Sequence, residues 1–214
     1  MWNTILATVL SVFIATGSAQ GVATRQLAGH EISLDKRVYN APWMSNIFKE
    51  NILLTIAYGR KIVAEGKPVD WDKVNKPFHY SFELEPGKVF SFTNMIDPKY
   101  TSVAQPWNQI HYYTSEGYLS DGILIGDGVC HLASLMNWVA KDAGLQVEAP
   151  TNHNFAAIPE ISKENGVAIY YDPNNLSVSS KQNLYIKNNK NVPVQFVFDF
   201  DETNLTFSIE ELSS

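Results

Sequence analysis

Cys130 is the residue whose type and position are best suited to chemistry, and it is the only cysteine in a chain of 214 residues. It follows a turn that contains Gly126 and Gly128, and apolar residues then recur at helical spacing. The first turn of a helix presents unpaired N–H groups and the positive end of the helix dipole, which favour a thiolate over a thiol. The sequence therefore predicts a nucleophilic sulfur at a helix start, beside two glycines that leave room for a substrate.

A lone cysteine in a helix is also often a small buried hydrophobe, and this alternative stays open. Two features oppose it. Cys130 stands at the helix start, and an exported chain seldom keeps an idle free thiol. We expect the helix to end at Gly144 as a C-terminal cap. Its predicted buried face comprises Leu132, Leu135, Met136, Val139, Ala140 and Ala143.

A histidine and an acidic residue follow the cysteine in the order of nucleophile, base and orienting group that several thiol enzymes share. His153 falls in an extended run, and Asp172 follows the next extended run. His131 points about 100° away from Cys130 along the helix, so we expect it to have a surface or supporting role beside the turn. These residues lack the close ligand pairs of a zinc site, so we expect no metal and no cofactor.

The composition predicts one globular domain. A chain of this length with 45% hydrophobic residues can bury a sizeable core, and its net charge of −6 lacks the basic patch of a nucleic-acid binder. An aromatic stretch precedes the glycine turn, and we expect it to form one wall of a substrate cleft. Its candidate substrate-binding rings are Trp107, Tyr113 and Tyr118, each with core packing as the alternative.

The N-terminal region predicts export. Residues 5–15 are apolar and small residues precede Gln20, so residues 1–19 are interpreted as a signal peptide. No lysine or arginine precedes the apolar run, which leaves an uncleaved membrane anchor as the alternative. Residues 20–42 are polar and without periodicity, and they are interpreted as a spacer before a domain over 43–214.

The remaining pattern predicts an α+β fold with a mostly antiparallel sheet packed on the central helix that carries the cysteine. An N-terminal helix is expected from Ser45 to about Ala64. Strands over 78–84 and 89–92, joined by Pro86-Gly87, are expected to form a hairpin. Further extended runs are expected at 147–158, 167–171, 184–186, 192–200 and 205–209.

Four short motifs occur in the order found in one known family. They are a Pro-Gly turn before a Phe-Ser-Phe strand, a glycine run into a cysteine and a helix that ends Ala-Gly-Leu, an Asn-His pair, and Lys-Asn-Asn after an aliphatic residue. From about Asn51 to Leu212 the chain resembles VanW domains. The matching residues are Pro86, Gly87, Phe90, Ser91, Phe92, Gly126, Gly128, Cys130, Ala143, Gly144, Leu145, Asn152, His153, Ile186, Lys187, Asn188 and Asn189.

The resemblance implies an exported bacterial protein of the cell envelope or extracellular space, with peptidoglycan stem peptides as its partner. Some VanW domains act as cysteine-dependent L,D-transpeptidases that form 3-3 cross-links, and other members have no assigned activity. Cys130 would attack the carbonyl of the third stem residue and hold an acyl-enzyme for a neighbouring amine. His153 would act as base, and the backbone from Gly126 to Cys130 would form an oxyanion hole.

The chain also departs from the family pattern. Asp127 replaces a glycine, and we expect it to cap the helix and to raise the pKa of the thiol. His131 replaces a usual glutamine beside the turn. The family's acidic residue is missing, so Asp172, Asn174 or Asn175 would supply the third member. The alternatives are a thiol amidase or peptidase with the same cysteine, and a non-catalytic module that binds the cell wall.

Overall fold

A computed structural model describes residues 23–38, 41–122 and 124–213. The segment expected to be a signal peptide or anchor, 1–19, lies outside these residues. Among the residues described, no helix has both the length and the apolar character that crossing a membrane requires.

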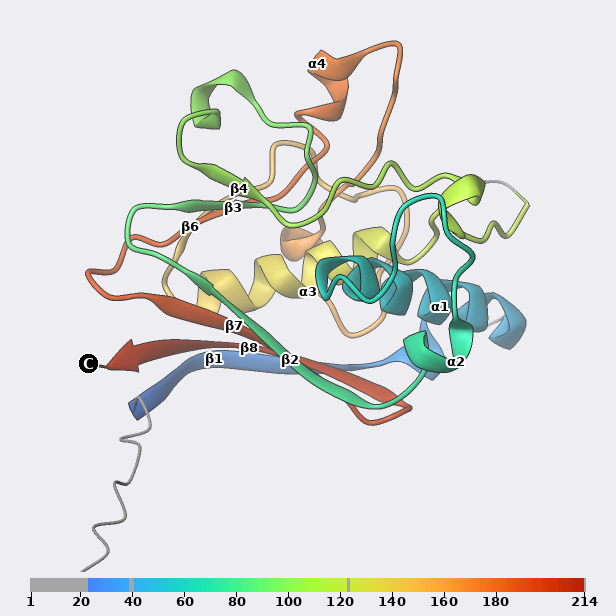
Figure 1. The fold of residues 1–214 in the computed structure, drawn as a ribbon, viewed down its shortest axis with the longest axis horizontal. Helices are drawn as coiled ribbons and strands as arrows, with labels where there is room; N and C mark the ends of the chain where they lie inside the picture. Colours follow the sequence, from blue (N-terminus) through green and yellow to red (C-terminus); the bar gives the residue numbers. More distant parts are fainter. Residues whose placement is uncertain (1–22, 39–40, 123, 214) are drawn as a thin grey trace, which may run out of the picture.

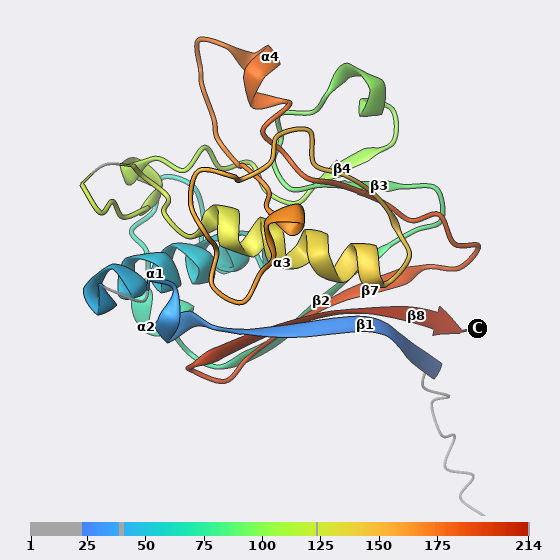
Figure 2. The ribbon, with the colours of Figure 1, turned by 180° about the vertical axis from the view of Figure 1, so that it is seen from behind.

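Two four-stranded sheets lie on either side of the central helix α3 (Val129–Asp142), as Figures 1 and 2 show. The larger sheet is antiparallel throughout. Its strands, in spatial order, are β1 (Ala23–Ser33), β8 (Asn204–Ser213), β7 (Val194–Phe200) and β2 (Phe78–Leu84). The smaller sheet contains β4 (Ala104–Pro106), β3 (Val89–Ser91), β6 (Tyr185–Lys187) and β5 (Gln146–Glu148), with β3 and β4 parallel. The predicted α+β class is therefore confirmed, with two sheets instead of one.

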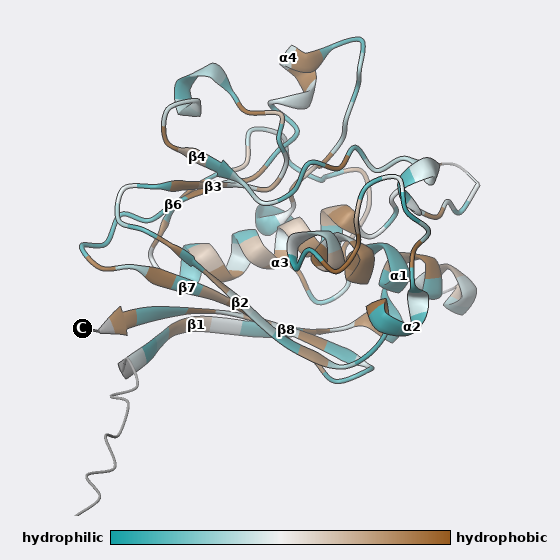
Figure 3. Ribbon diagram, in the orientation of Figure 1, coloured by the Kyte–Doolittle hydropathy of each residue, from teal (hydrophilic) through white to brown (hydrophobic). Residues whose placement is uncertain are grey.

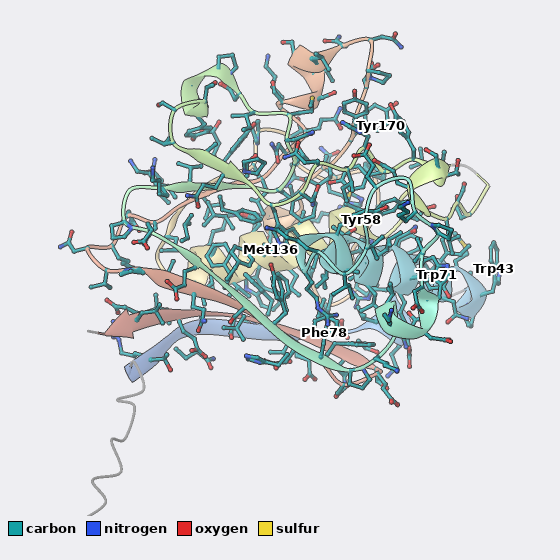
Figure 4. All side chains as sticks on the ribbon, viewed as in Figure 1. Trp43, Tyr58, Trp71, Phe78, Met136 and Tyr170 are labelled. Atoms are coloured by element: carbon teal, nitrogen blue, oxygen red, sulfur yellow. The ribbon has the colours of Figure 1, made fainter. Side chains whose placement is uncertain are left out.

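The predicted central helix is confirmed nearly residue for residue. All six apolar positions of its expected face are buried, and Figure 4 shows Met136 in the middle of the molecule. The helix ends before Gly144, which has a φ of +70°, and the N–H of Leu145 donates to the carbonyl of Ala140. Apolar spacing and a glycine cap are local signals, and they predicted this element correctly.

The larger sheet also follows its sequence pattern. Phe78, Tyr80, Phe82 and Leu84 turn one face of β2 inward, whereas His79 and Glu83 are exposed. Figure 3 shows the resulting mixture of apolar and polar residues along the strands. Alternation with period two places one face of such a sheet against the core and the other in water.

The expected spacer over 20–42 is wrong for residues 23–33. Residues 23–33 form β1, which pairs with β8 from Ala23 opposite Ser213 to Ser33 opposite Asn204. Of this strand Ile32 is deeply buried. A strand can be held by backbone hydrogen bonds to a partner about 180 residues away without alternating apolar and polar residues in its own sequence. The polar sequence of residues 23–33 therefore gave no sign of a strand. The domain consequently begins before residue 43.

The expected hairpin is also wrong, because β2 pairs with β7 and β3 pairs with β4 and β6. The turn at Pro86-Gly87 carries the chain from one sheet to the other. Asn188 lies at the return crossing, where its Nδ2 donates to Leu84 O at 2.8 Å and its carbonyl accepts from the Gly87 N–H at 2.9 Å. Two of the motifs quoted above therefore meet in space and tie the sheets together.

Helix α1 (Pro42–Gly59) is shorter than expected and is not capped by Ser45, whose hydroxyl instead bonds the backbone of Val38. Ile62, which falls within the expected helix, lies beyond its actual end and is exposed. Figure 4 shows Trp43 at the outer end of this helix. Within the part of the chain that the structure describes, the other helical elements are short: α2 (Trp71–Val74), α4 (Leu176–Ser179) and four 3-10 turns at Leu34–Lys36, Pro98–Tyr100, Thr114–Glu116 and Lys163–Asn165.

Candidate functional site

A cavity of about 820 Å³ opens where the N-terminal halves of α1 and α3 meet. Its walls come from the starts of the two helices, the turn over 124–128, residues 111–113, the loop over 153–160 and the segment 169–171. Cys130, His131 and His153 all line it. Segments far apart in the sequence thus bring the predicted nucleophile and two histidines into one pocket.

Cys130 is the second residue of α3, so its sulfur lies in the first helical turn as predicted. The residue as a whole is partly exposed, and its Sγ accepts the N–H of Ile169 at 3.3 Å. Burial, with a smaller contribution from the charge of Asp127, raises the pKa of the thiol to about 11. The N–H of Ile169 and that of Cys130 itself act in the opposite direction. The expected thiolate is therefore wrong for neutral pH, because desolvation outweighs the helix terminus.

Asp127 does not cap the helix, contrary to expectation. The N-cap is Gly128, and Asp127 Oδ2 accepts the N–H of Asp121 at 3.2 Å. Burial raises the pKa of Asp127 to about 6, helped by the charge of Asp121 and opposed by that hydrogen bond. Above pH 6 the pocket thus holds a carboxylate whose charge raises the pKa of the thiol, as expected from sequence.

The glycines of the turn serve a different purpose from the one predicted. Gly126 and Gly128 have φ values of +83° and +98°, which side chains rarely adopt. A Cβ on Gly128 would lie 2.5 Å from the carbonyl oxygen of Phe48 in α1. The absent side chain therefore lets α1 pack against the start of α3, and on that side it leaves no room for a substrate.

His153 and His131 are both buried in the pocket, each with 5% of its surface exposed. Their rings are nearly perpendicular, with centroids 6.2 Å apart, and the Nδ1 of each has no hydrogen-bond partner among the described residues. Burial lowers the pKa of both, and the charge of Arg37 lowers that of His131 further. Both imidazoles are therefore uncharged at neutral pH and able to accept a proton.

The expected surface position of His131 is wrong, because its ring packs against Phe48 with centroids 5.0 Å apart. It is a second histidine of the pocket. The reason is that α1 covers the start of α3, which the sequence of α3 does not indicate.

Asp172 does not join the predicted triad. Its Oδ1 accepts the N–H of Asn174 at 2.9 Å within the turn, and it does not line the cavity. Asn175, another candidate, caps α4 by accepting the N–H of Val178 at 3.2 Å. Neither residue contacts His153 among the described interactions, because both are engaged in local turn geometry.

Of the three predicted substrate-binding rings, Tyr113 alone lines the pocket, with 39% of its surface exposed. Trp107 packs in the core, where its ring stacks on Phe198 with centroids 5.5 Å apart. Tyr118 is fully buried, and its hydroxyl lies 3.0 Å from the hydroxyl of Thr55. For Trp107 and Tyr118 the prediction is wrong, and core packing, the alternative given for each, is what the structure has.

Tyr112 is a pocket residue that sequence reasoning missed. It has a φ of +65°, an uncommon value for a residue with a side chain, and 7% of its surface is exposed. Its hydroxyl has no hydrogen-bond partner among the described residues, and it lies near enough to Cys130 for their charges to interact. The aromatic stretch before the glycine turn was the available signal, but it could not single out this ring.

Arg37 was also missed, because it falls in the expected spacer. Its side chain is completely buried at the pocket wall, where it forms an ion pair with Glu160 and donates from Nε to Ser33 O at 2.7 Å. A buried guanidinium needs such a partner to offset its desolvation. It fixes the loop over 153–160 against the end of β1. No group of three or more His, Cys, Asp or Glu side chains suited to a metal ion occurs within 23–38, 41–122 and 124–213.

Comparison with known families gives one match, to the family described as VanW like protein, over residues 80–210. No curated protein and no solved structure matches the chain. The matched segment runs from β2 into β8 and includes α3, the cysteine turn and His153. It omits β1 and α1, although these complete the larger sheet and the pocket. Because the match covers more than half of the sequence, the chain belongs to the VanW-like protein family.

Proposed function

We propose that this is an exported protein of the bacterial cell envelope that transfers acyl groups between peptidoglycan stem peptides through Cys130, as an L,D-transpeptidase does. One observation carries the proposal: Cys130, a partly exposed residue in the first turn of α3, shares a cavity of about 820 Å³ with two uncharged imidazoles. A cavity of this size suits a peptide of a few residues.

The protonated thiol dictates how acylation starts. Cys130 must give up its contact with Ile169, and an imidazole must accept the thiol proton as the sulfur attacks the carbonyl carbon. His153, whose Nδ1 has no partner among the described residues, takes this role. The C–S bond forms, the C–N bond to the terminal stem residue breaks, and the proton passes from His153 to the departing amine.

The tetrahedral intermediate carries a negative oxygen that needs donors. The Val129 and His131 N–H groups already donate to the carbonyls of Gly126 and Gly128, at 3.1 and 2.9 Å. The Cys130 N–H and the hydroxyl of Tyr112 are the better donors, because that hydroxyl shares the cavity with Cys130 and has no partner among the described residues. Tyr112 thus supplies a polar group that the glycine turn does not.

The test is the mass of the intact protein after incubation with a tetrapeptide stem. We expect an adduct equal to the stem without its terminal residue, formed by the natural chain and absent from Cys130→Ala. His153→Gln should slow adduct formation, whereas His79→Gln, at an exposed histidine of β2 bonded to Asp199, should not. A failure to form any adduct between pH 6 and pH 10 would rule out the acyl-enzyme.

A second candidate is a non-catalytic module that binds stem peptides. Two observations favour this candidate: the raised pKa of Cys130, and the bond of Asp172 to the Asn174 N–H in place of a contact with His153. Wall fragments from cells with and without Cys130→Ala distinguish the candidates: transfer predicts fewer 3-3 cross-links, a thiol amidase predicts altered stem lengths, and a binding module predicts neither change.

A further inference from the structure

Three aromatic rings form a cluster in the wall of the same cavity. The ring centroid of His111 lies 4.3 Å from that of Tyr171 and 5.8 Å from that of Tyr113. Tyr113 and Tyr171 are 5.8 Å apart and meet edge to face. All three residues line the pocket, so a ligand inside it can reach this cluster.

Two carboxylates give the cluster a negative field. Glu116 is buried, its oxygens accept the N–H groups of His111 and Tyr113 at 2.8 to 3.0 Å, and its Oε1 lies 3.5 Å from Nδ1 of His111. Asp172 follows Tyr171 directly. Desolvation raises the pKa of the Tyr113 hydroxyl, and the neighbouring Tyr171 and the charges of Glu116 and Asp172 raise it further.

Ring faces beside carboxylates are the surroundings that attract an ammonium ion. An apolar ligand would be served by the rings alone, and it would gain nothing from two negative charges. The chemistry of the cluster therefore favours a cationic amine over a neutral group of the same size.

The cluster also lies close to the reacting sulfur. The N–H of Ile169 bonds Cys130 Sγ at 3.3 Å, and Tyr171 is two residues farther along the chain, which can span at most about 7 Å. Tyr112, between His111 and Tyr113, lines the same cavity as Cys130, and the charges of the two residues interact. An amine held by the rings would thus share the cavity with a thioester on Cys130.

We propose that His111, Tyr113 and Tyr171 bind the ammonium group of the acyl acceptor, that the charges of Glu116 and Asp172, neither of which lines the cavity, favour it from behind these rings, and that His111 removes a proton to release the amine. This inference rests on the acyl transfer proposed above. It gives Asp172 a role in charge recognition in place of the triad position expected from sequence.

In the second half-reaction, the acceptor amine takes the acyl group from Cys130. The ammonium gives one proton to His111, whose Nδ1 lies 3.5 Å from Glu116 Oε1. The free amine attacks the thioester carbonyl, the C–N bond forms and the C–S bond breaks. The nitrogen loses a second proton, which the departing sulfur takes up as the thiol is restored. His111 then returns the first proton to solvent.

The test uses the full chain carrying Cys130→Ala, which cannot be acylated, and two small probes of equal length, butylammonium and n-butanol. Binding is followed at constant ionic strength by the NMR shifts of histidine and tyrosine ring protons. We expect butylammonium to bind about fivefold more tightly than n-butanol, as an ammonium over aromatic rings does. Tyr171→Leu should remove most of this preference.

Charge variants supply the matched control. Asp172→Asn should weaken butylammonium binding, whereas Glu83→Gln, which removes one negative charge from an exposed position of β2, should not. Equal binding of the two probes, or equal effects of the two charge variants, would overturn the amine site. The amine site is tested without any acylation, so its failure and the absence of an acyl-enzyme are separate results.

Discussion

The raised pKa of Cys130 makes a quantitative prediction about its reactivity. Its pKa rises from an ordinary 9.0 to about 11. Two pKa units correspond to about a 100-fold smaller thiolate fraction at any pH below 9. Because the thiolate is the form that reacts with iodoacetamide, the alkylation rate should follow this fraction.

The assay compares native protein with the same protein unfolded in urea, as a function of pH. Restricted access slows the native reaction equally at every pH, so the midpoint of the rate profile reports the pKa and the absolute rate does not. We expect a midpoint near pH 11 for the native protein and near pH 9 for the unfolded one.

A charge variant separates the two causes of the raised pKa. Asp127→Asn should move the native midpoint to lower pH, because it removes a negative charge that acts on the thiol. Asp72→Asn in α2, an exposed position outside the cavity wall, should leave it unchanged. A native midpoint at or below that of the unfolded protein would refute the reasoning and restore the activated thiolate that the sequence suggested.

Three further predictions concern the architecture around the site. Gly128→Ala should lower the free energy of unfolding, measured in urea, by about 2 kcal/mol more than Gly66→Ala does. Both glycines have a positive φ, but only a side chain at position 128 would clash with Phe48. Equal losses of stability would contradict the close contact between the two helices. Deletion of residues 23–33 should abolish cooperative thermal unfolding, measured by circular dichroism, because it leaves one edge of β8 without its partner strand. An unchanged melting curve would show that residues 23–33 are a spacer after all. Burial lowers the pKa of His131, so protonation of this imidazole favours the unfolded chain, and the natural protein should lose stability as the pH falls below 6.5. His131→Gln should lose less stability over this range in thermal melts. A variant with the same pH dependence as the natural protein would refute this.

The site was predictable only in part, and particular residues show why. Cys130 and His153 do share a pocket, and the order of chemical groups along the chain sufficed to nominate them. Trp107 and Tyr113 occur in the same aromatic stretch, yet one packs in the core and the other lines the cavity. Both are aromatic residues of one stretch, so the elements that pack around each ring decide between the two positions.

The fold shows the same division between local and long-range signals. Apolar spacing and Gly144 determined α3, and alternation determined the inward face of β2, because each signal comes from neighbours in the chain. The partner of β2 is β7, and the partner of β1 is β8. The sequence of a strand does not indicate which other strand it pairs with. Strand pairing depends on which backbone edges meet after collapse.

By itself the sequence determined a cysteine at the start of an amphipathic helix, and this holds because helix periodicity and glycine turns are properties of a few adjacent residues. Only the tertiary structure decided what that cysteine is chemically. The approach of α1, the loop with His153 and the segment with Ile169 removes water from the sulfur, and the cost of placing a charge there exceeds the benefit of the helix terminus. The position of the cysteine is thus decided locally, whereas its protonation state comes from parts of the chain that lie far away in sequence.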